Sequence, residues 1–160
     1  IVAGRGNGIF APNDGVTREE MVKLVVTAFS NVNSGAVSAF SDVSADRWSY
    51  PYIATASKLG LITGVDAFNF APTGSITRES LAVILYRVYN LTGKAVAAED
   101  ASFTDSEDIS SYAKDAVNAM AKLGVMEGMG DGTFSPKTVV TRAQAAKVIY
   151  SLITLIGGNI

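Results

Sequence analysis

Residues 128–142 read GMGDGTFSPKTVVTR, and their Gly128, Phe134, Pro136 and Thr141-Arg142 recur at the same internal spacing in two other places. The other copies are GVDAFNFAPTGSITR at residues 64–78 and GRGNGIFAPNDGVTR at residues 4–18. Chance does not place five residue types at identical offsets three times, so the sequence predicts a repeat protein. Any site on the repeat unit is then expected in more than one copy.

Each Thr-Arg pair is predicted to begin an amphipathic helix. Threonine is a good N-cap because its hydroxyl accepts a hydrogen bond from a first-turn N–H. Glu20 and Gln144 lie three residues after their threonines and complete a capping box, whereas the second copy has Ser80 there. Apolar residues then follow at i, i+3, i+4, i+7 and i+8, which predicts one buried face per helix. These residues are Met21, Leu24, Val25, Ala28 and Phe29; Leu81, Ile84, Leu85, Val88 and Tyr89; and Ala145, Val148, Ile149, Leu152 and Ile153.

A second helix is predicted before each of the two later signatures, over residues 48–59 and 111–123. Upstream of these helices lie Phe40-Ser41-Asp42-Val43 and Phe103-Thr104-Asp105-Ser106. The chain therefore divides into repeat 1 (residues 1–39), repeat 2 (40–102) and repeat 3 (103–160), and repeat 1 holds only the second half of a unit. The expected fold class is all-α, with three tandem helix-loop-helix repeats of which the first is truncated. Because stacked repeats bury faces between neighbours, we expect a partner chain or an upstream segment to complete repeat 1.

The composition excludes several classes of function. The chain of 160 residues has a net charge of −2, which argues against a nucleic-acid partner. It contains no cysteine and no histidine, so the usual zinc sites, thiol nucleophiles and Ser-His-Asp triads are excluded, and no metal or cofactor is expected. The longest apolar stretch, residues 148–156, is about half of what spans a bilayer, so no membrane span is expected.

The set of motifs resembles the S-layer homology repeat family over nearly the whole chain. Family repeats carry a Phe-Ser/Thr-Asp-Val opening, a Trp at the start of the first helix, a Leu-Gly turn, a Gly…Phe-x-Pro loop and a Thr-Arg-Ala-Glu signature. Here Trp48 occurs once, Tyr112 takes its place in repeat 3, and Glu19 and Glu79 replace the signature alanine in two copies. The resemblance implies a pseudo-threefold, three-pronged spindle around a central helical bundle.

The resemblance also implies a location and a ligand. Such repeats anchor exported proteins, so the expected location is extracellular, at the cell wall or S-layer of a Gram-positive bacterium. The implied partner is a secondary cell-wall polysaccharide with pyruvylated N-acetylmannosamine, or else peptidoglycan. The ligand is expected in grooves between repeats, where the signature arginines contact the pyruvyl carboxylate. These arginines are Arg18, Arg78 and Arg142.

Helix physics gives the arginines two alternative roles. A cation in the partly positive first turn of a helix is unfavourable unless an anion joins it. A carboxylate ligand would reverse that sign, because the arginine and first-turn N–H groups would converge on it. The alternative is that each arginine pairs with a local Glu or with a loop aspartate, such as Asp42 or Asp105.

The remaining candidate residues also carry two readings. Trp48 and Tyr112 are candidates for stacking on a sugar ring, with packing against the neighbouring repeat as the alternative, and packing is favoured for Tyr112. Gly64 and Gly128 are expected to serve backbone geometry, with nearby loop N–H groups as possible sugar contacts. The core is predicted to include Phe10, Phe70 and Phe134.

The leading interpretation is a non-catalytic module that binds an acidic polysaccharide through arginines at helix N-termini. One alternative is structural self-assembly of the repeats in a surface layer. Another is a wall glycosidase with a carboxylate pair, either Asp42 with Asp46 or Asp105 with Asp108. Neither pair recurs in both copies, so catalysis is disfavoured.

Overall fold

A computed structural model of the chain describes residues 4, 8–96 and 101–157. These residues form five α-helices and two single-turn 3-10 helices, with no β-strand among them, so the all-α prediction is confirmed. The spindle implied by the family resemblance stays a prediction. The helices are α1 (Arg18–Phe29), α2 (Tyr50–Lys58), α3 (Arg78–Leu91), α4 (Lys114–Lys122) and α5 (Arg142–Ile156), with the 3-10 helices η1 (Ser106–Asp108) and η2 (Ser111–Ala113).

The Thr-capped helices form as predicted. The side chains of Thr17, Thr77 and Thr141 each accept the N–H of the residue three positions on. Capping boxes are complete in α1 and α5. In α3, Ser80 cannot reach back to the cap N–H as Glu or Gln does, and its hydroxyl lies 2.9 Å from the hydroxyl of Thr77.

The helices predicted over residues 48–59 and 111–123 are shorter than expected. α2 begins only at Tyr50, because Ser49 occupies the cap position and Pro51 is tolerated in the first turn, where no N–H is needed. Residues 111–113 form the 3-10 helix η2 before α4 begins at Lys114. Trp48 therefore lies before α2, and Tyr112 lies in η2 before α4.

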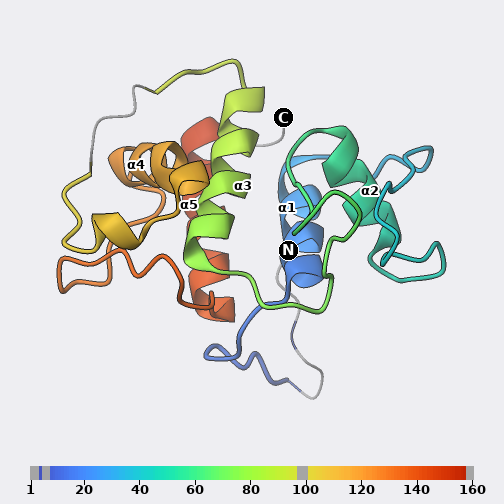
Figure 1. The fold of residues 1–160 in the computed structure, drawn as a ribbon, viewed down its shortest axis with the longest axis horizontal. Helices are drawn as coiled ribbons and strands as arrows, with labels where there is room; N and C mark the ends of the chain where they lie inside the picture. The colour runs from blue at the N-terminus through green and yellow to red at the C-terminus, as the bar shows by residue number, and fades with distance from the viewer. Residues whose placement is uncertain (1–3, 5–7, 97–100, 158–160) are drawn as a thin grey trace.

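The helices pack around one shared hydrophobic core. α2 packs against α1, α4 packs against α3, and α5 contacts both α1 and α3. Figure 1 shows α1, α3 and α5 in the middle of the molecule, with α4 and α2 on opposite sides. The apolar faces predicted for α1, α3 and α5 are buried in this core, except that Ile153 is only partly buried.

Three backbone hydrogen bonds join the segments that precede α1, α3 and α5 into a closed ring. The N–H of Val16 donates to the carbonyl of Val140 (2.9 Å), that of Val140 to Ile76 (3.0 Å), and that of Ile76 back to Val16 (3.1 Å). The ring links the first repeat directly to the last. The repeats therefore interlock around a centre, unlike an open solenoid in which each repeat contacts only its neighbours.

The same interlock satisfies the first-turn N–H groups of the three helices. The N–H of Arg18 donates to the carbonyl of Gly74 in repeat 2 (2.8 Å), and the N–H of Glu19 to that of Pro72 (3.0 Å). Donors that helix ends leave unpaired are thus used between repeats. The equivalent bonds run from Arg78 to Thr138, Glu79 to Pro136, Arg142 to Asp14 and Ala143 to Pro12.

The Phe-x-Pro loops contain a left-handed residue that is held by an aspartate. Ala71 has a φ of 57° and Ser135 a φ of 56°, a conformation that is costly for residues other than glycine. In repeat 2 the carboxylate of Asp42 accepts the N–H groups of Phe70 (2.8 Å) and Ala71 (2.7 Å). In repeat 3 the carboxylate of Asp105 accepts those of Phe134 (2.8 Å) and Ser135 (2.7 Å) in the same way.

The loop phenylalanines are buried in two of the three copies. Phe70 and Phe134 are 1% and 0% exposed. Phe40 and Phe103 pack on them, with ring centroids 5.5 and 5.3 Å apart. Phe10 is 38% exposed, so the prediction that it belongs to the core is wrong. The reason is geometric, because among the described residues no second phenylalanine packs on Phe10 as Phe40 does on Phe70 and Phe103 on Phe134.

Replacement of Asp105 by alanine should destabilise the fold. The change leaves the N–H groups of Phe134 and Ser135 without their charged acceptor beside a left-handed residue. We expect the free energy of unfolding in urea to fall by about 1.5–3 kcal/mol, the worth of hydrogen bonds to a charged group. The control is Asp108→Ala, an exposed carboxylate on η1, with an expected change within about 0.5 kcal/mol. Equal stability of the two variants would show that the carboxylate does not hold the loop.

Candidate functional site

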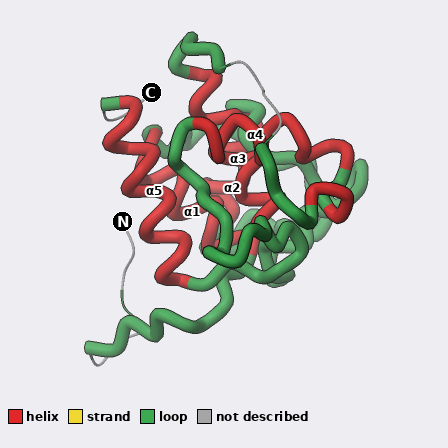
Figure 2. The backbone as a smooth tube through the Cα atoms, turned by 90° about the vertical axis from the view of Figure 1, so that its left-hand side faces the viewer, coloured by secondary structure: helices red, strands yellow, loops and turns green. Residues whose placement is uncertain are grey.

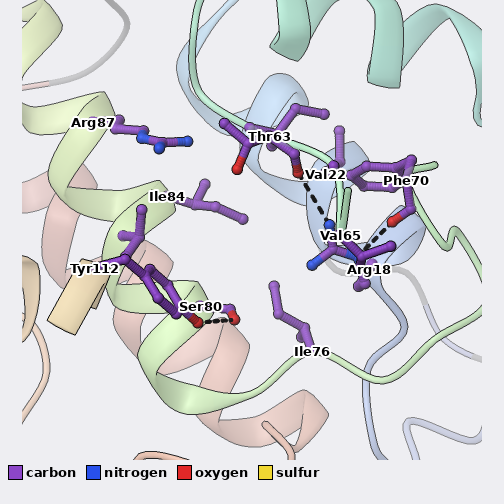
Figure 3. Close-up of a pocket in the computed structure, with 13 residues that line it drawn as sticks. Arg18, Val22, Thr63, Val65, Phe70, Ile76, Ser80, Ile84, Arg87 and Tyr112 are labelled. Carbon is purple, nitrogen blue, oxygen red and sulfur yellow. Dashed lines mark hydrogen bonds between the residues drawn. The ribbon is translucent and has the colours of Figure 1, made fainter. Parts of the chain in front are cut away.

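A groove of about 400 Å³ lies between α1, α3 and the loop at residues 61–65, and Figure 3 shows its lining. We call it groove 1. Helix α1 and the 61–65 loop form one side of it, α3 the other, and Tyr112 projects from repeat 3. All three repeats thus contribute to one cavity. Its lining consists of Arg18, Val22, Ile62, Thr63, Gly64, Val65, Phe70, Ile76, Ser80, Val83, Ile84, Arg87 and Tyr112.

A second, smaller groove of about 190 Å³ occupies the equivalent place one repeat further on, and we call it groove 2. Arg78 replaces Arg18, and the loop at residues 125–129 replaces the loop at 61–65. The lining consists of Arg78, Val125, Met126, Glu127, Gly128, Met129, Gln144, Lys147 and Val148.

Each signature arginine donates to backbone carbonyls of the next repeat. In groove 1, Nε of Arg18 donates to the carbonyl of Phe70 (2.8 Å) and Nη2 to that of Thr63 (3.2 Å). The guanidinium carbon also lies 4.6 Å from the centre of the Phe70 ring. These contacts hold the side chain in the groove wall, so any ligand meets a cation whose position is already set.

Arg78 and Arg142 repeat this arrangement. Nε of Arg78 donates to the carbonyl of Phe134 (2.7 Å) and Nη2 to that of Glu127 (2.8 Å). Nε of Arg142 donates to the carbonyl of Phe10 (2.9 Å). The expectation that first-turn N–H groups would join the arginine on an anion is wrong, because those donors bind carbonyls of the next repeat.

Asp42 and Asp105 act on the arginines through space. Among the described residues no ion pair joins Asp42 to Arg18 or Asp105 to Arg78, because both carboxylates bind the N–H groups of their own loop. Burial lowers the pKa of Arg18 and Arg78, and the charge of the nearby aspartate opposes that shift. Both guanidinium groups stay charged at neutral pH. Neither aspartate lines groove 1 or groove 2, so as site candidates they position the loop and the cation.

Tyr112 lies at the edge of groove 1, held by Glu79. Its hydroxyl donates to the carboxylate of Glu79 (3.2 Å) and lies 3.2 Å from the hydroxyl of Ser80. The same carboxylate accepts hydrogen bonds from Ser110 (3.0 Å) and from Lys137 (2.7 Å). Tyr112 is nevertheless 61% exposed, so it contacts the neighbouring repeat and leaves most of its side chain accessible. The choice between packing and sugar stacking stays a prediction.

Trp48 occupies the equivalent place beside α1. It is 50% exposed, and the ammonium of Lys23 lies 5.6 Å from its ring centre. Arg47 and Ser49, on either side of Trp48 in the chain, both donate hydrogen bonds to the buried carboxylate of Glu19, at 2.7 and 2.6 Å. Trp48 lines neither groove 1 nor groove 2. By repeat equivalence it would border a groove around Arg142, whose loop at residues 1–7 lies mostly outside the described residues.

The two glycine candidates serve backbone geometry, as predicted, and also line the grooves. A Cβ added at Gly64 would lie 2.3 Å from the carbonyl oxygen of Asn69, and one at Gly128 would lie 2.7 Å from that of Thr133. Each loop therefore closes on itself only with glycine at this position.

Sequence reasoning missed Arg87, which lines groove 1 opposite Arg18. Its Nη1 donates to the carbonyl of Leu61 (3.3 Å) at the start of the 61–65 loop. A signal was available: Ser80, Ile84 and Arg87 follow helical spacing along one face of α3. The spacing alone does not separate this face from the edge of the buried stripe of α3.

Two further properties concern only the described part of the chain. There, no helix is long and apolar enough to cross a membrane. Nor does that part contain a group of three or more His, Cys, Asp or Glu side chains placed to hold a metal ion.

Comparison with known proteins gives a consistent family match. The sequence model of the S-layer homology domain matches residues 1–22, 39–82 and 102–146, which is more than half of the chain. An endoglucanase of Bacillus sp. (strain KSM-635) is 34% identical over 96% of the chain. The S-layer protein sap of Bacillus anthracis is 33% identical over 92% of it, and an uncharacterised cell wall amidase of the same organism is 32% identical over 91%.

The chain spans only a small part of each of these relatives. It covers 16% of the endoglucanase, 18% of the S-layer protein and 27% of the amidase. The similarity therefore concerns a segment that these otherwise differently named proteins share, and it covers about a quarter or less of each.

The buried glutamate beside Tyr112 should make stability depend on pH. Burial tends to raise the pKa of Glu79, but hydrogen bonds from Lys137 and Ser110 outweigh it, so the pKa lies below the ordinary value of 4.5. A depressed folded-state pKa stabilises the fold above the ordinary value, and this stabilisation is lost as the pH falls through the folded value. We therefore expect thermal melts to show a midpoint that falls as the pH is lowered below 4.5.

The variant Glu79→Gln should show a flatter dependence over the same range. Glu107→Gln, an exposed carboxylate on η1, is the matched control and should keep the dependence of the unmodified chain. If the thermal midpoint of Glu79→Gln changed with pH as steeply as that of Glu107→Gln, the role given to Glu79 would be contradicted.

Proposed function

The chain belongs to the S-layer homology domain family, and on this premise we propose that it is a non-catalytic module that anchors an exported protein to the cell wall. The observation that carries the proposal is groove 1, a cavity between repeats lined by two arginines, a tyrosine and apolar side chains. Such a combination suits an acidic sugar, because a sugar offers apolar ring faces as well as charge. The proposed location is the surface of a Gram-positive bacterium, in its cell wall or S-layer.

The proposed ligand is a secondary cell-wall polysaccharide that carries a carboxylate, of the pyruvylated N-acetylmannosamine type. The guanidinium of Arg18 is the anion-binding group, and hydrogen bonds to a charged partner are about twice as strong as neutral ones. The ring of Tyr112 and the side chains of Ile62 and Ile84 offer surfaces for the sugar. Because Arg18 is already held by two carbonyls, little side-chain entropy is lost on binding.

A modest affinity per groove is sufficient for anchoring. Where more than one binding site of an anchored protein engages the same polymer, later contacts form at high effective concentration. The parent protein can then stay attached although single contacts open and close.

Three of the four carboxylates considered for catalysis are hydrogen-bonded within loops. The oxygens of Asp42 accept the N–H groups of Phe70 and Ala71, and Asp105 does the same in repeat 3. The carboxylate of Asp46 accepts the hydroxyl of Ser44. These contacts support a binding role and disfavour a glycosidase.

We also propose that the chain divides into repeats at residues 39/40 and 102/103, and that a further segment completes repeat 1. This segment would cover α5. Val22 and Val26 are 1% and 0% exposed on α1, the helix that packs against α2. Their equivalents on α5, Ala146 and Tyr150, are partly and 71% exposed, on the helix that lies along one edge of the molecule in Figure 2. The expected cover is a Phe-x-Asp segment with its helix, from an upstream segment or a partner chain.

Binding to cell-wall sacculi tests the anchoring proposal. We expect the chain to sediment with purified sacculi, and to stop doing so after mild acid that removes pyruvyl ketals. Raised salt should weaken the binding, because the contact is between charges near the surface. Binding that survives the acid would redirect the proposal to peptidoglycan or neutral glycan. No sedimentation at all would overturn it in favour of self-assembly.

Fusion of a second copy of residues 39–60 directly before Ile1 tests the cover proposed for α5. The spacing then matches repeat 2, in which Gly60 directly precedes Leu61. We expect a higher thermal midpoint, because Tyr150 and Phe10 become buried and the added aspartate reaches the N–H groups of Phe10 and Ala11. A matched fusion with alanine in place of that aspartate should gain less. No gain in either fusion would show that something else covers this face.

A further inference from the structure

We propose that the two described grooves are not equivalent: groove 1 binds the acidic ligand through a pair of arginines, Arg18 and Arg87, while Glu127 keeps groove 2 from doing so. This inference rests on the proposed function and adds a site and a source of selectivity to it. The two grooves are formed by equivalent elements, a signature arginine, the following Gly-containing loop and the next Thr-capped helix, so their lining side chains can be compared position by position.

The first difference is the number of arginines, which is two in groove 1 and one in groove 2. Arg87 lines groove 1 from α3, and in Figure 3 its guanidinium points toward Thr63, across the groove from Arg18. Its counterpart on α5, nine residues after the signature arginine, is Ser151. Two arginines therefore face a ligand in groove 1, and one hydrogen bond to the carbonyl of Leu61 keeps Arg87 directed at the loop.

The second difference is a carboxylate in the wall of groove 2. Glu127 stands where groove 1 has Thr63, directly before the glycine of the loop. It pairs with Lys147 at 2.9 Å, and Lys147 stands where groove 1 has Val83. Hydrogen bonding from Lys147 lowers the pKa of Glu127, so it is ionised at neutral pH. In this pair the carboxylate offsets the charge of Lys147, so the lysine adds little attraction for an anion. The carboxylate also lies next to any incoming carboxylate, which is unfavourable.

The third difference is access to the signature arginine. Arg78 is 5% exposed, and its Nη2 bond to the carbonyl of Glu127 is short at 2.8 Å. Arg18 is only partly buried, and its bond to the carbonyl of Thr63 is longer at 3.2 Å and exposed. The volumes agree with this contrast, at about 400 Å³ for groove 1 and about 190 Å³ for groove 2.

The side chains that set this difference are separate from the backbone contacts that hold the arginines. Arg18 binds the carbonyl of Thr63, and Arg78 binds the carbonyl of Glu127. Substitution of either side chain therefore changes the charge of a groove without removing the contact of its arginine. This allows a test that does not depend on signature arginines, whose loss would also weaken the fold.

The experiment is titration of the isotope-labelled chain with the methyl glycoside of 4,6-O-pyruvyl-N-acetylmannosamine, followed by amide NMR and calorimetry. In the unmodified chain we expect shift changes in the 61–65 loop and in α3 near Ser80, and much smaller ones at residues 125–129. Arg87→Gln and Thr63→Glu should each weaken binding in groove 1 about tenfold or more, the effect of one hydrogen bond to a charged group. Lys58→Gln, an exposed cation at the end of α2, removes the same charge outside the groove and should leave binding unchanged.

The reverse change should create a site. The triple variant Glu127→Thr, Lys147→Val and Ser151→Arg gives groove 2 the charged groups of groove 1, and we expect new shift changes at residues 125–129. Thermal melts of each variant check that the fold is intact.

The outcomes separate the two proposals. No binding of the glycoside to the unmodified, folded chain would overturn the proposed ligand itself. Binding that is equally strong in groove 2, or that is unchanged by both Arg87→Gln and Thr63→Glu, would overturn the inequivalence while the anchoring function stands.

Discussion

The closed ring of backbone hydrogen bonds among Val16, Ile76 and Val140 is the constraint on which the rest of the structure depends. It brings the segments before α1, α3 and α5 together at one centre, so each helix begins against the loop of the next repeat. The first-turn N–H groups and the signature arginines then find carbonyl acceptors in that loop. The grooves lie between repeats because the ring places each helix N-terminus beside the loop of another repeat.

The signature arginines combine a structural contact with a proposed binding role. A cation in the first turn of a helix is unfavourable by itself. Here two carbonyls and a phenylalanine ring surround Arg18, and the same holds for Arg78. The fold thus stabilises a cation in the groove wall without an ion-pair partner among the described residues. In our proposal, Thr63 and Glu127 set the difference between the grooves, and their side chains take no part in holding the arginine.

Asp42 and Asp105 bind different partners from those that charge alone favours. Both carboxylates are near the signature arginines, so the sequence allows a direct ion pair. The structure assigns both carboxylates to N–H groups of the Phe-x-Pro loop, where a left-handed residue needs support. Two backbone donors at 2.7–2.8 Å occupy each carboxylate, so it acts on the arginine only by its charge.

The sequence by itself determined the repeat, the all-α class, the three Thr caps, the buried helix faces and the roles of Gly64 and Gly128. These follow from local chemistry and periodicity, since capping and amphipathic spacing act within a few residues. Only the tertiary structure decided that Phe10 is exposed, that Tyr112 borders a groove, and that Arg87 faces Arg18 across it. Those facts depend on which repeat lies against which, and the order of the chain does not state that the last repeat closes on the first.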